Sequence, residues 1–303
     1  MKILITGGTG LIGTALRKSF QQDNHEVVFI SRKPDQASGS TKAISWEINA
    51  IVHELSDTDV VINLAGTSIS GSNPLLMRWT PYRKSLILSS RLEAGKLITE
   101  AIQLSSNKPG VLIQASAIGY YGNTGSDPVD ETNLPGADFL ASVCQEWEKS
   151  TAPVESLGVR RVITRIGLVF SEDGGLLPLL ALPFRFFIGG VIGSGNQVLS
   201  WIHIHDVVQA IKFLIEQPQT QGIYNLTAPN PVDNQAFAQS LGKTLNKPVW
   251  LPVPAIIFKL GLGEAATLAL DGRQVFPTRL LEAGYQFKYF TLQPGLDNIW
   301  RKP

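Results

Sequence analysis

The residues best suited to chemistry in this sequence begin near its amino terminus, in a glycine-rich run that could hold phosphate groups. Gly7, Gly10 and Gly13 form a GxxGxxG pattern between an apolar run and an amphipathic stretch. In such a strand–turn–helix, the first glycine allows a tight turn, the second lets the backbone approach a pyrophosphate, and the third lets the helix pack closely. The free N–H groups at the helix start then face the phosphates. The pattern predicts a dinucleotide-binding loop rather than a simple turn.

The end of the second apolar run bears on which dinucleotide is bound. A carboxylate about 20 residues past the glycines normally accepts a hydrogen bond from the ribose 2′-OH of NAD. Here the run ends in Ser31, Arg32 and Lys33. A hydroxyl and a guanidinium can bind a 2′-phosphate, which a carboxylate would repel. The sequence therefore predicts NADP(H), with two alternatives: Arg32 and Lys33 are ordinary loop cations, or nearby Asp35 supports NAD.

Short apolar runs and longer amphipathic segments alternate in the first half of the chain and must position these residues. Strands are expected over residues 2–6, 26–31, 60–65, 111–115 and 160–170, and helices over 11–22, 81–103 and 138–156. Continuous apolar strands suit a parallel sheet that is covered on both faces. The alternation predicts an α/β fold, a doubly wound parallel sheet of Rossmann type.

The pattern changes after Phe170. A stretch rich in Gly and Pro covers residues 174–195, and helices are expected over 206–217 and 232–245. We expect a nucleotide-binding domain over residues 1–170 and a smaller C-terminal substrate-side lobe over 171–303. The boundary is soft and interleaved with the sheet, because no flexible linker separates the two parts.

Composition excludes several classes of partner. The 303 residues carry 26 Lys plus Arg against 25 Asp plus Glu, which leaves no cationic footprint for nucleic acid or an anionic membrane. The longest apolar stretch, residues 174–184, is shorter than the ~20 residues that span a bilayer. The start of the chain shows no signal-peptide core, and a single cysteine excludes an intrachain disulfide framework. We therefore expect a cytoplasmic protein that binds a small molecule.

Several longer blocks resemble a known family. The start GGTGLIG and residues 61–66 (VINLAG) resemble the extended short-chain dehydrogenase/reductase superfamily. Residues 116–122, 138–148, 183–206, 225–232 and 280–287 are similar to its atypical NADP-binding "epimerase family", some members of which are labelled SulA-like and linked to cell division. The similarity extends from the amino terminus to about Leu292.

The resemblance implies a set of residues around the cofactor. They are Gly7, Thr9, Gly10, Leu11, Ile12, Gly13, Ser31, Arg32, Asn63, Leu64, Ala65, Arg91 and Arg165. Arg91 matches a family position near the cofactor, with a solvated helix cation as the alternative. Arg165 lies in an apolar strand and needs an anionic partner, either a protein carboxylate or, slightly favoured, the ligand.

The superfamily's usual acid is missing. A Tyr exchanges a proton with the substrate oxygen, and a Lys four residues later lowers the pKa of that Tyr. The alignment places Phe139 and Val143 at these positions, and no YxxxK occurs in the chain. Substitute candidates are Ser116, Tyr120 and Tyr121, which follow the fifth strand at the edge where such sheets bind ligands. The alternative is that these side chains only pack.

Two histidines in the run SWIHIHD do not predict a metal site. His203 and His205 would share one face of an extended segment, but no further ligand is evident. We expect His203 to be a hydrogen-bonded structural residue, Asp206 to cap the following helix and Cys144 to be buried and inert.

Two functions remain open from the sequence. The first is an NADP(H)-dependent oxidoreductase or epimerase that acts on a small carbonyl or sugar-like substrate. The second is a catalytically silent NADPH-binding regulatory protein, which the missing Tyr–Lys pair favours and which could be linked to cell division. The family resemblance also implies a homodimer.

Overall fold

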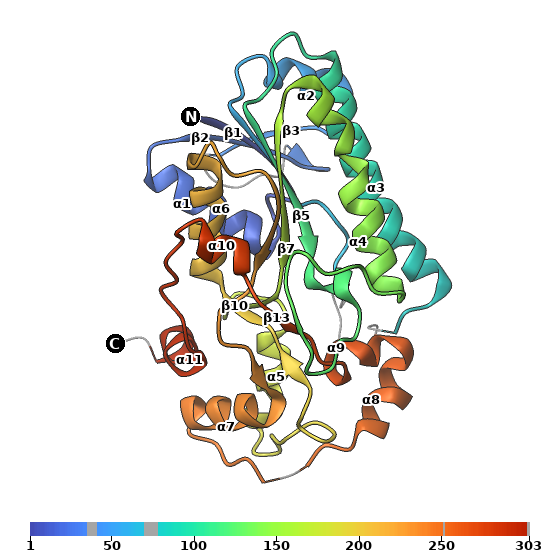
Figure 1. Cartoon of the computed structure of the whole chain (residues 1–303), viewed down its shortest axis with the longest axis vertical. Coiled ribbons are helices and arrows are strands. Elements are labelled where there is room, and N and C mark those ends of the chain that lie inside the picture. The colour runs from blue at the N-terminus through green and yellow to red at the C-terminus, as the bar shows by residue number, and fades with distance from the viewer. Residues whose placement is uncertain (35–40, 70–77, 251, 302–303) are drawn as a thin grey trace.

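The computed structural model describes residues 1–34, 41–69, 78–250 and 252–301, and a parallel sheet lies at its centre (Figure 1). Within these residues the sheet has seven strands in the spatial order β11–β7–β5–β4–β1–β2–β3. The strands are β1 (Lys2–Thr6), β2 (Glu26–Ile30), β3 (Lys42–Ile44), β4 (Val60–Asn63), β5 (Val111–Ala117), β7 (Arg160–Ile166) and β11 (Gly222–Leu226). Every neighbouring pair is parallel, so the doubly wound sheet predicted from the sequence is confirmed.

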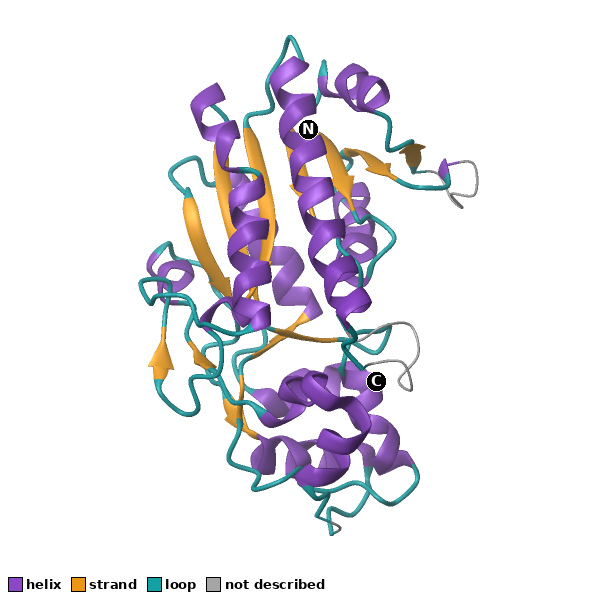
Figure 2. Ribbon diagram, turned by 90° about the vertical axis from the view of Figure 1, so that its right-hand side faces the viewer, coloured by secondary structure: helices purple, strands orange, loops and turns teal. Residues whose placement is uncertain are grey.

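Helices cover both faces of this sheet (Figures 1 and 2). On one face lie α1 (Leu11–Gln22) and α6 (Ile204–Glu216), and on the other lie α2 (Ile48–Leu55) and α3 (Pro81–Leu104), with α4 (Phe139–Ser150) beside α3. Successive strand residues point to opposite faces. Ile3 and Ile5 therefore join the core under α1 and α6, whereas Leu4 joins the core under α2 and α3.

Two expected elements are interrupted in the structure. The strand expected over residues 160–170 breaks at Gly167 into β7 and β8 (Leu168–Phe170), and a Cβ on Gly167 would lie 2.5 Å from the carbonyl oxygen of Ser200. The chain therefore passes too close to its neighbour there for any side chain. The helix expected over 138–156 ends at Ser150, and a 3₁₀ helix (Ala152–Leu157) follows that contains Pro153, because proline cannot continue an α-helical hydrogen-bond ladder.

A smaller lobe lies beyond the carboxyl edge of the sheet (Figure 1). Its helices are α5 (Leu177–Arg185), α7 (Asn234–Leu245), α8 (Ala255–Leu262), α9 (Thr267–Leu270) and α11 (Leu292–Trp300), while α10 (Thr278–Glu282) lies beside β11. Short strand pairs join the lobe to the sheet: β8 with β10 (Trp201–His203), β9 (Val198–Leu199) with β12 (Val232–Asp233), and β6 (Pro128–Val129) with β13 (Gln274–Val275). A separate core around Phe170, Trp201 and Phe237 stabilises it.

The chain crosses between sheet and lobe more than once. Although α6 and β11 follow residue 170, they belong to the central sheet and its helical cover. The division at residue 170 stays a prediction. None of the described helices combines the length and the hydropathy needed to cross a membrane.

Candidate functional site

The glycine-rich turn between β1 and α1 is packed so tightly that Gly7, Gly8 and Gly13 have no room for a Cβ; on Gly8 it would lie 2.6 Å from the Cβ of Phe29. Gly7 has φ +69°, and a Cβ there would lie 2.8 Å from the backbone of Leu64. A Cβ on Gly13 would lie 2.3 Å from the carbonyl oxygen of Gly7. The turn out of the strand and the close approach of the helix therefore both depend on glycine.

Gly10 differs because the fold itself leaves its position open. A Cβ there would meet only the carbonyl oxygen of Gly7, at 3.3 Å, and the residue is exposed. Gly10 is the N-cap of α1, and no side chain of the described residues caps that helix. An uncapped helix start carries free N–H groups and positive charge. This turn therefore fits a phosphate group.

At the end of β2 the side chains that could select the cofactor face solvent. Arg32 is exposed, and the Ser31 Oγ accepts a hydrogen bond from the Lys33 backbone N–H at 3.1 Å. Both side chains are accessible to a ribose phosphate. Asp35, the residue that kept NAD open as an alternative, lies outside the described residues.

The end of β4 is fixed by a buried chain of polar side chains. The Thr6 hydroxyl donates to Asn63 Oδ1 at 2.6 Å, and Asn63 Nδ2 donates to Gln114 Oε1 at 2.9 Å. The N–H groups of Leu64 and Ala65 both donate to Thr6 Oγ1 at 3.1 Å. Asn63 is fully buried, and its side chain ties the neighbouring strands β1, β4 and β5 together. The cofactor contacts predicted for Asn63, Leu64 and Ala65 stay predictions.

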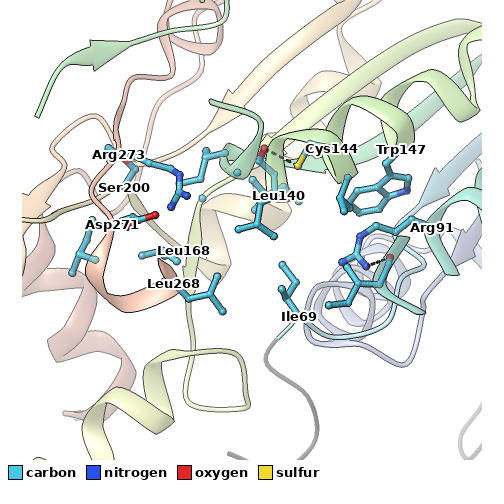
Figure 3. Close-up of a pocket in the computed structure, with 18 of the residues that line it drawn as sticks. Ile69, Arg91, Leu140, Cys144, Trp147, Leu168, Ser200, Leu268, Asp271 and Arg273 are labelled. Carbon is cyan, nitrogen blue, oxygen red and sulfur yellow. Dashed lines mark hydrogen bonds between the residues drawn. The ribbon is translucent and has the colours of Figure 1, made fainter. Parts of the chain in front are cut away.

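A cavity of about 150 Å³ lies where the carboxyl edges of β5 and β7 meet the smaller lobe (Figure 3). Its walls are mostly apolar, and they include Ile69, Ile87, Leu140, Val143, Leu168, Leu199 and Leu268. Charged groups lie at its two ends, with Arg91 beside Trp147 at one end and Asp271 with Arg273 at the other (Figure 3). Such a cavity, apolar with a few convergent polar groups, is typical of a small-molecule site.

Helix α4 presents no proton-transfer pair to this cavity. The residues of α4 in the wall are Leu140, Val143, Cys144 and Trp147. Val143, expected at the lysine position, is among them, whereas Phe139 instead packs edge-on against Trp79 at a ring distance of 5.4 Å. Burial raises the pKa of the Cys144 thiol to about 11, so this side chain is neutral at physiological pH.

Arg91 is a buried cation in the cavity wall, so the alternative of a solvated helix cation is wrong. Its Nη1 donates to the carbonyl oxygens of Thr67 at 3.0 Å and Ile87 at 2.8 Å, and its guanidinium lies 4.8 Å from the Trp147 ring centroid. Burial lowers its pKa to about 10. A Cβ on Gly66 would lie 2.9 Å from Arg91 Cζ, so that glycine makes room for the guanidinium.

Arg165 has its anionic partner inside the protein, which corrects the slight preference for a ligand. Its Nε and Nη2 donate to the two carboxylate oxygens of Glu148 at 2.9 and 3.0 Å. The Ser116 hydroxyl donates to Glu148 Oε1 at 2.6 Å. The bidentate pair satisfies the buried charge, so the reason for assigning Arg165 to the cofactor disappears.

The two tyrosines belong to the same buried network. Arg165 Nη1 donates to the Tyr121 hydroxyl at 3.1 Å, and that hydroxyl donates to Asn225 Oδ1 at 2.8 Å. Burial raises the pKa of Tyr121 to about 12. The Tyr120 ring lies 3.3 Å from the Arg165 guanidinium carbon. Neither tyrosine nor Ser116 lines the cavity, so these catalytic candidates lie beside it rather than in its wall.

The histidines serve the start of α6. His203 is the N-cap, and its Nδ1 accepts a hydrogen bond from the His205 N–H at 3.0 Å. The expectation that Asp206 caps the helix is wrong, because its carboxylate instead accepts from the N–H groups of Lys288 and Tyr289, both at 2.9 Å. Among the described residues no group of His, Cys, Asp and Glu side chains could hold a metal ion.

Asp271 and Arg273 were not predicted as site residues from the sequence. They lie between α9 and β13, at the far end of the cavity from Arg91. The one sequence feature near them is Gly272, which stands between these two opposite charges. In the structure a Cβ on Gly272 would lie 2.8 Å from the Val198 nitrogen, so a side chain there has no room. Their place in the cavity depends on this long-range contact, which no local pattern reveals.

Comparison with known proteins agrees with this geometry. The model of the "NAD dependent epimerase/dehydratase family" matches residues 3–227, and a "Domain of unknown function (DUF1731)" matches residues 253–299. The epimerase family protein YfhF of Bacillus subtilis is 38% identical over 99% of this chain and 98% of its own length. The chloroplastic SDR39U1 homolog of Arabidopsis thaliana is 38% identical over 99% of this chain and 86% of its own length.

A solved structure is also similar over its full length. The human epimerase family protein SDR39U1 (isoform 2), crystallised with NADPH, has a TM-score of 0.91 at 32% identity and covers 100% of both chains. Fold, glycine turn and cavity together define an atypical extended short-chain dehydrogenase/reductase architecture. The chain belongs to the NAD dependent epimerase/dehydratase family.

Proposed function

We propose that this chain binds NADP(H) along the carboxyl edge of its sheet and is an oxidoreductase for a small, largely apolar carbonyl or carbinol substrate. The glycine turn with its open Gly10 position supports a pyrophosphate there, and the half-buried Ser31 with the exposed Arg32 supports a 2′-phosphate. The human relative crystallised with NADPH supports the same choice of cofactor.

The observation that carries the proposal is the cavity at the edges of β5 and β7. Bound NADPH supplies a hydride. Apolar side chains such as Ile87, Val143 and Leu168 exclude water from the reacting carbon. Arg91 places a buried positive charge in the same wall, where it favours an anionic group of the cofactor.

Asp271 is the acid of the cavity wall that can hold a proton for the substrate oxygen. Its carboxyl is half-buried, and burial raises its pKa against the opposing effect of the Arg273 charge. In reduction, the hydride adds to the carbonyl carbon and this proton adds to the oxygen, which gives an alcohol. Replacement of Asp271 by Asn is expected to lower kcat by about 10²-fold or more while NADPH affinity is kept.

The test is oxidation of NADPH against a panel of apolar aldehydes and ketones, followed by absorbance with purified protein. Turnover that Asp271→Asn reduces and Glu146→Gln leaves unchanged supports the proposal. Cofactor choice is tested separately by dissociation constants for NADPH and NADH. Arg32→Ala is expected to weaken NADPH binding and to leave NADH binding unchanged; equal effects on both would contradict the 2′-phosphate assignment.

A second candidate is an NADPH-binding protein without turnover, in which occupancy by the cofactor is the signal. It is favoured by the absence of the Tyr–Lys pair on α4 and by the position of Ser116, Tyr120 and Tyr121 outside the cavity wall. A link to cell division belongs to this candidate. Tight NADPH binding with no oxidation across the whole panel would favour it over the enzyme.

The homodimer and the cytoplasmic location stay predictions. Light scattering on the purified full chain measures the first, and fluorescence microscopy of a tagged chain measures the second.

A further inference from the structure

An arginine at the lobe end of the cavity is poorly paired within the fold. Arg273 is 9% exposed, and its Nε and Nη2 are buried without a hydrogen-bond partner among the described residues. Figure 3 shows its guanidinium on the cavity side, close to Asp271 and opposite Leu140. The nearest carboxylate oxygen in an ion pair, Asp138 Oδ2, is 3.9 Å from Nη2, which is too far for a hydrogen bond.

The backbone of Arg273 is held without help from its side chain. Its N–H donates to the carbonyl oxygen of Val198 at 3.0 Å, and its own carbonyl accepts from the Ser200 hydroxyl at 2.6 Å. Asp138 is also engaged elsewhere, because its Oδ1 caps α4 by accepting from the Ala141 N–H at 2.8 Å. The guanidinium therefore has only long-range charge contacts with Asp138 and Asp271 and makes no hydrogen bond to the turn or to the helix start.

A buried charge without hydrogen bonds is costly to a fold. The other buried arginine near the site, Arg165, is fully paired with Glu148. Arg273 instead keeps two buried nitrogens without a partner, in the wall of a mostly apolar cavity that also carries Asp271 and Arg91. Such a site suits a ligand that supplies the missing acceptor.

The charges and apolar side chains of the cavity restrict the chemical class of the ligand. A planar guanidinium matches the two oxygens of a carboxylate. The second charge of a phosphate would be repelled by Asp138, only 3.9 Å from Nη2. The remaining wall, with Leu140, Leu168 and Leu268, suits a hydrocarbon body.

We propose that Arg273 binds the carboxylate of an apolar carboxylic acid substrate, whose hydrocarbon body fills the cavity between Arg273 and Arg91. The inference rests on the proposed function only in treating this cavity as the substrate site.

Binding of a matched pair of probes tests it directly. Hexanoate and hexanamide differ by the charge at one end, and their affinities for the full chain can be measured by calorimetry without cofactor and with NADP⁺. We expect the wild type to bind hexanoate about 10- to 100-fold more tightly than hexanamide, as for a charged hydrogen bond in place of a neutral one. Arg273→Gln abolishes this preference, and Arg185→Gln, an exposed arginine of the same lobe, keeps it.

A stability measurement separates a ligand site from a structural role. If Arg273 serves a ligand, Arg273→Met has an unchanged or higher Tm without ligand, because an unsatisfied charge is removed. A lower Tm for Arg273→Met would mean that the guanidinium holds the fold, and it would overturn the proposal. Equal affinities of the wild type for the two probes, no binding of hexanoate, or a preference that survives in Arg273→Gln would overturn it as well.

Failure of the carboxylate site can be distinguished from failure of the proposed oxidoreductase function. Probe affinity measured without cofactor does not depend on NADPH binding or on turnover. A wild type that prefers hexanoate and binds no NADPH would contradict the proposed oxidoreductase and leave the carboxylate site standing. A wild type that oxidises NADPH with uncharged ketones and shows no preference for hexanoate would support the proposed oxidoreductase and contradict the carboxylate site.

Discussion

At the scale of single residues, the glycine turn separates residues that the fold requires from one that it does not. Gly7 and Gly13 are surrounded by backbone atoms at 2.3 to 3.0 Å from a Cβ that they lack, whereas Gly10 has a single such neighbour at 3.3 Å. The same residue type therefore serves packing at two positions and, in our proposal, ligand approach at the third.

This contrast predicts opposite phenotypes for two matched substitutions. Gly13→Ala is expected to lower the free energy of unfolding by about 1–3 kcal/mol, because the added methyl overpacks the turn. Gly10→Ala is expected to change it by less than about 1 kcal/mol, because only an N-cap is altered. Its NADPH affinity should fall roughly tenfold or more, since the methyl occupies the path of the pyrophosphate. Urea unfolding and fluorescence titration measure the two quantities. Equal NADPH affinity of Gly10→Ala and wild type would contradict the assignment.

At the scale of elements, one buried ion pair fixes α4 against the sheet. Glu148 of α4 accepts from Ser116 of β5 and from Arg165 of β7, so a single carboxylate joins three elements. The position of α4 in turn sets the cavity wall, because Leu140 and Val143 lie on the same helix.

Removing that carboxylate's charge should be costly. Glu148→Gln is expected to lower the free energy of unfolding by about 3–5 kcal/mol, because it leaves the Arg165 charge buried without compensation. The control is Glu146→Gln on the same helix, whose pair with Lys149 is exposed and worth less than about 1 kcal/mol. Urea denaturation followed by circular dichroism measures both. Similar losses in the two variants would show that the Arg165 charge is satisfied in another way.

The start of α6 predicts a pH dependence of stability. Burial lowers the pKa of His203 to about 4 from its usual 6.5, so the unfolded chain binds a proton there between these values and the folded chain does not. Folding stability from this group is therefore present above pH 6.5 and is lost as pH falls toward 4. The variant His203→Asn keeps a capping side chain but cannot take up this proton. Between pH 7 and pH 4.5 its free energy of unfolding should fall by about 2–3 kcal/mol less than that of the wild type.

Unfolding free energies at the two pH values, obtained in urea, check this prediction. His53→Asn is the control, because His53 is exposed and should leave the pH dependence as it is in the wild type. Parallel pH profiles of His203→Asn and wild type would contradict it.

At the scale of the whole molecule, the lobe reaches back to the phosphate loop. A Cβ on Gly175 would lie 3.2 Å from a methyl of Leu11, at the start of α1. The cavity likewise has one wall on the sheet side, with Val143, and another on the lobe side, with Leu268. A cofactor and a substrate bound there would contact both the sheet and the lobe, so their binding would stabilise the two parts together.

NADPH should therefore stabilise the whole chain rather than one half. At a concentration of 100 times its dissociation constant, NADPH is expected to add about 2.7 kcal/mol to the free energy of unfolding. Differential scanning calorimetry should show a single transition that moves upward, and hydrogen exchange should slow both around residues 8–14 and around residues 171–176. Protection confined to residues 8–14 would mean that the lobe does not respond to the cofactor.

The sequence by itself determined the parallel class of the sheet, five of its seven described strands and the phosphate loop, because these follow local rules; the strands β3 and β11 were not predicted. Continuous apolar runs predict buried parallel strands, and the spacing of Gly7, Gly10 and Gly13 predicts a strand–turn–helix. The absence of a Tyr–Lys pair was equally visible in the sequence. These features need only residue types and short separations.

The tertiary structure decided the roles of the charged residues, because a charge is interpreted through its partners. Arg165 lies 17 residues from Glu148 along the chain, and only the packing of α4 on the sheet makes them an ion pair. Arg273 lies on an unremarkable turn, and only contacts with Val198 and Ser200 bring it to the cavity. Partners distant in the chain leave no periodic or local signal. Only the tertiary structure therefore distinguishes Arg165, which is fully hydrogen-bonded, from Arg273, which is not.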